Sequence, residues 1–162
     1  MSSRGGSSTL SVGEQGRTLY ALAVLRVLLG VLWLANLSWK LPPDFGKKDP
    51  EGLLYNFERA KEYAVVAPLR DIADNVLIPH FTAFGWLVFL VELTAGVLLL
   101  LGLWTRVGAA IGLLQAIAIT LLVVQAPGEW VWTYVMLVAI SAVVLVAPAG
   151  SRLSLDAWRA RR

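Results

Sequence analysis

Residues 90–106 read LVELTAGVLLLLGLWTR, an apolar run that contains a single acidic side chain, Glu92. An ionisable group at the centre of a membrane helix costs about 2.5 to 3.5 kcal/mol on insertion scales, so its placement there is seldom accidental. The stretch leads to two linked predictions. The chain crosses a membrane, and Glu92 has either a partner or a function inside it.

The composition of the whole chain agrees with the first prediction. Of 162 residues, 57% are hydrophobic and 15% are charged, and the mean hydropathy is +0.68. These values differ strongly from those of soluble proteins and indicate an integral membrane protein. The net charge of +3 comes from basic residues beside apolar segments, so we expect no nucleic-acid partner. The chain has no cysteine, which excludes disulfides and thiolate metal sites, and we predict no metal site.

Hydropathy predicts four membrane spans, each close to the length that a helix needs to cross a bilayer. They cover residues 19–40, 81–104, 107–126 and 130–147. The predicted fold is an all-α integral membrane protein, a four-transmembrane-helix bundle with a long extracytoplasmic loop. A Ser/Gly-rich tail at residues 1–17 is expected to be disordered, residues 18–158 to form one domain, and residues 159–162 to form a basic tail.

The long loop between the first two spans carries its own helical periodicity. Apolar residues recur at helical spacing in two groups, and we predict two short amphipathic helices. Their apolar faces either lie on the membrane surface or roof the bundle, and the loop is either a connector or a functional lid. The two groups are Leu53, Phe57, Ala60 and Ala64, and Leu69, Ile72, Ala73, Val76 and Leu77.

The distribution of lysine and arginine beside the spans predicts the orientation. One side carries basic residues with few acids, whereas the long loop on the other side dilutes its basic residues with seven acids. We therefore expect a multi-pass protein of the cytoplasmic membrane with both termini in the cytoplasm. The basic residues of the cytoplasmic side are Arg4, Arg17, Arg106, Arg152, Arg159, Arg161 and Arg162.

Each predicted span places a polar residue in the cytoplasmic half of the bundle. At about 1.5 Å of rise per residue, Arg26 and Glu92 lie at roughly 10 and 16 Å, which makes them the natural ion pair. Gln115 and Ser141 are expected to satisfy the remaining hydrogen bonds. The pair is either a structural staple between helices, or a functional site that binds a polar headgroup or moves a proton.

Further polar residues follow toward the end of the first span, in ANLSWKL, residues 35–41. Asn36 and Trp39 are candidate ligand contacts there. Lys40 is expected to snorkel to the membrane interface, with a ligand contact as the alternative.

Two other features have structural interpretations. Gly108 and Gly112 form a GxxxG pattern, for which packing within the bundle is favoured over a dimer face. His80, the only histidine, is expected at the interface or at a helix N-terminus.

Three stretches carry a resemblance to a known family: LRVLLGVLWLANLSWKL (25–41), VELTAGVLLLLGLWTRVGAA (91–110) and GSRLSLDAW (150–158). They resemble the DoxX family of small four-helix membrane proteins. The long loop and the WVWTY stretch from Trp130 are more similar to its DoxD branch, which is associated with thiosulfate:quinone oxidoreductase. The matching positions are Arg26, Gly30, Lys40, Glu92, Gly96, Gly102, Thr105, Arg106 and LSLDA at 153–157.

The resemblance implies a membrane subunit of a quinone-linked oxidoreductase that acts on thiosulfate or another small sulfur species. Glu92 and Arg26 are then the candidate catalytic pair. Gln115, Lys40, Asn36, Trp39 and Arg106 are candidate contacts for substrate or quinone. Quinone is the expected cofactor, not covalently bound, and the expected partners are the lipid bilayer and either a redox or membrane subunit or a second copy. The alternatives are a non-enzymatic scaffold subunit of a larger membrane complex and a small transporter.

Overall fold

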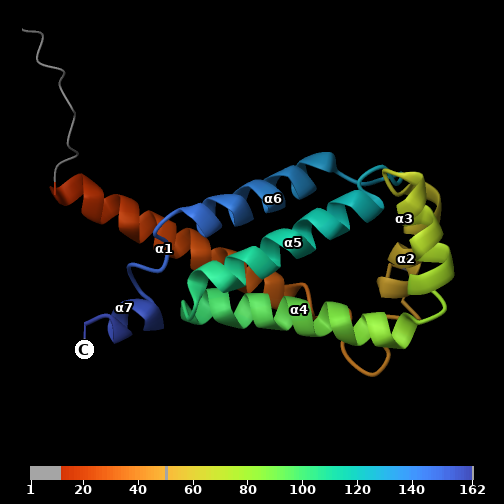
Figure 1. Ribbon diagram of the computed structural model, residues 1–162, viewed down its shortest axis with the longest axis horizontal. Helices are drawn as coiled ribbons and strands as arrows, with labels where there is room; N and C mark the ends of the chain where they lie inside the picture. The colour runs from red at the N-terminus through yellow and green to blue at the C-terminus, as the bar shows by residue number, and fades with distance from the viewer. Residues whose placement is uncertain (1–11, 50, 162) are drawn as a thin grey trace, which may run out of the picture.

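The computed structural model describes residues 12–49 and 51–161, and within these ranges the regular structure is entirely helical. Four longer helices form the body of the molecule, and shorter helices gather at its two ends (Figure 1). The longer helices are α1 (Val12–Ala35), α4 (Phe81–Leu101), α5 (Thr105–Val123) and α6 (Val131–Val146). The shorter ones are α2 (Leu53–Tyr63), α3 (Ala67–Ile72), the π-helix η1 (Ala73–Leu77) and α7 (Leu155–Arg159).

Three of the helices in the described ranges are long and apolar enough to cross a membrane, namely residues 13–35 of α1, α4 and α5. Helix α6 is equally apolar but has only 16 residues. The chain is therefore a multi-pass membrane protein, and the crossing by α6 stays a prediction.

The first helix differs from its predicted span at both ends. It starts at Val12, within the stretch that was expected to be a disordered tail, and residues 1–11 lie outside the described ranges. It stops at Ala35. The N–H of Asn36 still bonds to the carbonyl of Leu32, four residues earlier, but the N–H of Leu37 bonds to the carbonyl of Leu34, only three residues earlier. Residues 36–40 are consequently turns rather than the last part of a span.

Helices α1 and α4 approach each other closely at two glycines. A β-carbon built on Gly30 would lie 2.7 Å from the backbone nitrogen of Leu100, and one built on Gly96 would lie 2.7 Å from the side chain of Leu34. Small residues let two helix backbones approach in this way. The glycines Gly108 and Gly112 serve similar contacts inside the chain, against Leu98 and Trp33.

The buried apolar residues form two separate cores. The first joins the long helices, and its fully buried members include Leu29 of α1, Leu99 of α4 and Val144 of α6. The second joins the short helices α2 and η1 to the N-terminal part of α4, so these helices roof one end of the bundle. Its buried members are Phe45, Leu53, Phe57, Ala60, Ala73, Leu77 and Phe81.

The opposite end of the bundle is closed by the chain after α6. Gly102 ends α4 in the left-handed region at φ +63°, and the N–H of Leu103 bonds back to the carbonyl of Leu98. Helix α5 starts immediately afterwards, and Asp156 accepts hydrogen bonds from the N–H groups of Trp104 and Thr105, both at 3.0 Å. Burial raises the pKa of Asp156, but these hydrogen bonds outweigh it and hold the pKa below its ordinary value, so the carboxylate is charged at the helix N-terminus.

Candidate functional site: a buried ion pair between the two cores

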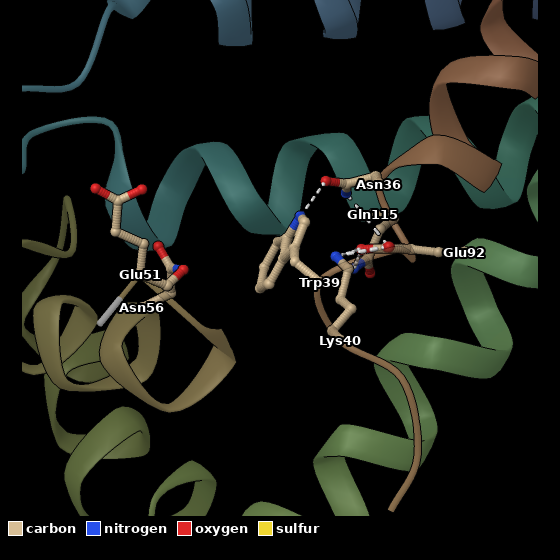
Figure 2. A network of polar contacts seen from close by, with 7 residues as sticks. All are labelled: Asn36, Trp39, Lys40, Glu51, Asn56, Glu92 and Gln115. Carbon is tan, nitrogen blue, oxygen red and sulfur yellow. Dashed lines mark hydrogen bonds and ion pairs between the residues drawn. The ribbon is translucent and has the colours of Figure 1, made fainter. Parts of the chain in front are cut away.

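Glu92 lies on α4 between the residues that this helix contributes to the two cores. Its side chain is fully buried, and it forms an ion pair with Lys40, whose ammonium lies 2.6 Å from a carboxylate oxygen. Asn36 and Gln115 each donate an amide hydrogen bond to the carboxylate at 3.3 Å. Donors from the turn after α1 and from α5 thus meet an acceptor on α4 (Figure 2).

The cluster is closed on one side by Trp39. Its indole N–H donates to Asn36 Oδ1 at 3.1 Å, and its ring centroid lies 4.3 Å from the ammonium of Lys40. The second contact has the geometry of a cation–π interaction. Trp39 is 36% exposed, whereas Lys40 is 2% exposed, so the indole separates the buried charges from the surface.

The prediction that Arg26 pairs with Glu92 is wrong. The guanidinium of Arg26 donates instead to the backbone carbonyls of Ala149, Arg152 and Leu153, at 3.3, 3.4 and 2.6 Å. It lies against Gly102, which is ten residues, or about 15 Å of helix rise, beyond Glu92 along α4. The depth estimate failed because it counted from a helix start at residue 19, whereas α1 starts at Val12 and Arg26 lies only at the level of Gly102, at the end of α4. The turn with Asn36 and Lys40, ten or more residues after Arg26, reaches the level of Glu92 instead.

Three further expectations differ from the structure. Lys40 does not snorkel to the interface, because it is buried against Glu92. Ser141 is buried but donates to the carbonyl of Leu137 in its own helix, so it takes no part in the cluster. Arg106 is exposed in the first turn of α5, next to Thr105, which bonds to Asp156, and away from Glu92. His80, by contrast, lies at a helix N-terminus as expected, at the N-cap position of α4, although its ring contacts the carbonyl of Val76 and does not cap the helix.

Of the seven candidate residues, five therefore come together: Glu92, Lys40, Asn36, Gln115 and Trp39. Sequence reasoning missed the surroundings of this cluster. Trp39 lines an open cleft of about 550 Å³ whose other walls are Asp49, Glu51 and Gly52 of the long loop. No sequence signal marks these loop residues, because only the folding of the loop back toward Trp39 brings Asp49, Glu51 and Gly52 there.

A second polar cluster near the cleft was also missed. Arg59 of α2 forms an ion pair with Glu129 at 2.5 Å and donates to the carbonyl of Pro127 at 2.6 Å. Tyr134 of α6 donates to the same carboxylate. These contacts join α2 to the turn between α5 and α6. The paired residues Arg59 and Glu129 are 70 residues apart in the sequence, so no local sequence pattern predicts their contact.

The arrangement around Glu92 has a definite chemical capacity. A carboxylate and an ammonium in contact within an apolar bundle form a neutral pair that can give up or accept a proton at an oxygen or nitrogen atom. The amides of Asn36 and Gln115 add hydrogen-bond donors directed at the same place. Intramembrane ionisable residues of this kind mark ion, proton or ligand sites by default.

Comparison with known protein families identifies the family of this chain. The family described as "TQO small subunit DoxD" matches residues 21–162. The chain belongs to the DoxD family. This match covers all of the cluster around Glu92 as well as the C-terminal segment that holds Arg26. No significant match was found to a curated protein or to a solved structure.

Proposed function

We propose that this chain is the membrane subunit of a quinone-linked oxidoreductase that takes electrons from thiosulfate or another small sulfur species, with quinone reacting beside Lys40 and Glu92. Membership of the DoxD family, the small subunit of thiosulfate:quinone oxidoreductase, supports the reaction class. The observation that carries the site is the buried Lys40–Glu92 pair with its two amide donors.

The residues of the cluster fit the headgroup of a quinone. The two carbonyl oxygens of a quinone accept hydrogen bonds, and the cluster offers donors at Lys40 Nζ, Asn36 Nδ2 and Gln115 Nε2. When bound, the quinone accepts two electrons and two protons. In the proposal, Lys40 and the amides orient the headgroup, and Glu92 holds a proton within its reach.

Electrons have to arrive from outside this chain. With no cysteine, the chain offers no thiolate to a sulfur donor, so we assign the sulfur chemistry to a partner subunit. We also propose that both termini face the cytoplasm, which places the roof of α2, α3 and η1 on the extracytoplasmic side, where such a partner would dock. All four long helices then cross the cytoplasmic membrane.

One observation favours a second candidate, a scaffold subunit without chemistry of its own. Both oxygens of the Glu92 carboxylate already have partners within the chain, as in a structural staple. Buried ion pairs of this kind can serve mainly to specify how helices dock. The two candidates differ in whether a quinone is held near the pair.

The test is the quinone content of the protein purified from its own membranes, followed by reduction of a short-chain quinone with thiosulfate. We expect bound quinone, and reduction that depends on a copurified partner. Lys40→Met should lose most of the bound quinone, whereas the control Lys61→Met, which removes an exposed ion pair with Asp74, should retain it. A stoichiometric partner with no quinone would support the scaffold. Uptake of a sulfur anion into vesicles without quinone reduction would support a transporter.

A further inference from the structure

Trp39 is the one residue that belongs both to the Glu92 cluster and to the wall of the cleft, among the residues the structure describes. On one side its indole touches Asn36 and Lys40. On the other side the cleft opens toward Asp49 and Glu51. Figure 2 shows the ring standing between Lys40 and Glu92 on one side and Glu51 and Asn56 on the other.

We propose that Trp39 is a gate, and that the cleft beside it is the water-filled entrance through which the Lys40–Glu92 pair exchanges protons. This inference rests on the proposed function. Each quinone reduced beside Glu92 takes up two protons along with two electrons from the sulfur donor. The pair that supplies these protons is almost completely buried, so it must be recharged from water by some route.

The chemistry of the cleft suits protons better than the sulfur substrate. Asp49 and Glu51 on its wall are both exposed carboxylates, which repel a divalent anion and raise the local concentration of cations. The sulfur anion is therefore expected to react elsewhere, on the partner.

The closed position of the gate is held by few contacts. One hydrogen bond to Asn36 and one cation–π contact with Lys40 fix the indole, and more than a third of its surface is exposed. A swing of the ring toward the cleft breaks these two contacts. Water would then reach Lys40 Nζ, which can pass a proton to Glu92 and regain one from the cleft.

The absence of cysteine allows a direct test by cysteine accessibility. Gln115→Cys places a thiol on α5 next to the Glu92 carboxylate. The rate at which a small charged methanethiosulfonate reagent labels this thiol reports the entry of water into the cluster. Trp39→Ala should speed this labelling by about tenfold, because it removes both the hydrogen bond and the cation–π contact of the closed state. Trp39→Leu, which fills more of the space, should give a smaller increase. Trp130→Ala, at an exposed tryptophan outside the cleft wall, is the matched control and should change nothing.

The side of the membrane from which the reagent reaches the thiol completes the test. In oriented vesicles, the faster labelling must come from the side on which a cysteine at the exposed Lys48 also reacts, because Lys48 and the cleft belong to the same loop. Unchanged labelling in both Trp39 variants, or labelling from the opposite side, would overturn the gate. Neither readout involves quinone, so loss of quinone binding with an intact gate would contradict only the proposed function.

Discussion

Two buried charges of this protein are stabilised in different ways. Glu92 has an opposite charge in Lys40, together with two amide donors. Arg26 is also fully buried, but its guanidinium is held by backbone carbonyls of the segment after α6. The first arrangement leaves a pair that can exchange protons, whereas the second fixes a loop against α1. We therefore assign Arg26 a structural role.

Substitution of Arg26 should separate stability from function. Arg26→Ala leaves three carbonyls of the C-terminal segment without their donor, and we expect a loss of about 3 kcal/mol of stability. Thermal unfolding in detergent measures this loss. At temperatures where the variant is folded, its bound quinone should equal that of the wild type. A folded Arg26→Ala protein that has lost its quinone would show that Arg26 is part of the quinone site and contradict its structural role.

At the scale of single residues, the sequence predicted which side chains are unusual but not which of them meet. Glu92 and Arg26 stand out because each is an ionisable residue inside an apolar run. Their partners do not stand out, since the carbonyls that hold Arg26 are backbone groups that any sequence provides. Lys40 looked like an interface residue because helix α1 was expected to continue through it.

At the scale of helices, the packing of α1 against α4 determines where the turn at residues 36–40 lies. Hydropathy located all four long helices within a few residues, except at the two ends of α1. It could not locate the contact between Gly30 and Gly96, because the same glycines permit close approach to any neighbour. That contact places Asn36, which follows the last residue of α1, beside Glu92.

Two alanine substitutions should show which glycine is essential. The added methyl of Gly30→Ala would meet backbone atoms of α4, which cannot move alone, whereas that of Gly96→Ala meets the flexible side chain of Leu34. We expect Gly30→Ala to cost about 2 kcal/mol and Gly96→Ala less than about 1 kcal/mol. Melting temperatures of the two variants compare them directly. Equal effects would mean that the helices can shift apart at this crossing.

At the scale of the whole molecule, the short helices α2, α3 and η1 roof one end of the bundle and α7 lies at the other (Figure 1). The composition of the chain was enough to predict a membrane bundle, and the periodicity of the long loop was enough to predict helices within it. The positions of the roof and of the C-terminal segment depend on contacts such as Arg59 with Glu129 and Asp156 with Thr105, which join distant parts of the chain.

The two ends should face opposite sides of the membrane. Single cysteines at Lys48 and Ser151, both exposed, can be introduced without a background signal. An impermeant thiol reagent should label the Lys48 position in intact cells and the Ser151 position only after permeabilisation. The reverse pattern would invert the proposed orientation. Labelling of both positions in intact cells would contradict the proposed crossing of all four long helices.

The central claim is that the Glu92 carboxylate acts on quinone rather than only joining helices. The measurement is the affinity of a short-chain quinone for Glu92→Gln, compared with wild type and with Glu129→Gln, which changes the carboxylate of the half-buried ion pair with Arg59. We expect Glu92→Gln to insert and fold, with a lower melting temperature because Lys40 loses its buried counter-charge. It should bind quinone about tenfold or more weakly, since the charge-assisted hydrogen bond that holds the Lys40 ammonium beside the headgroup is lost. Glu129→Gln should bind normally. Wild-type affinity in a folded Glu92→Gln protein would show that the pair is a structural staple.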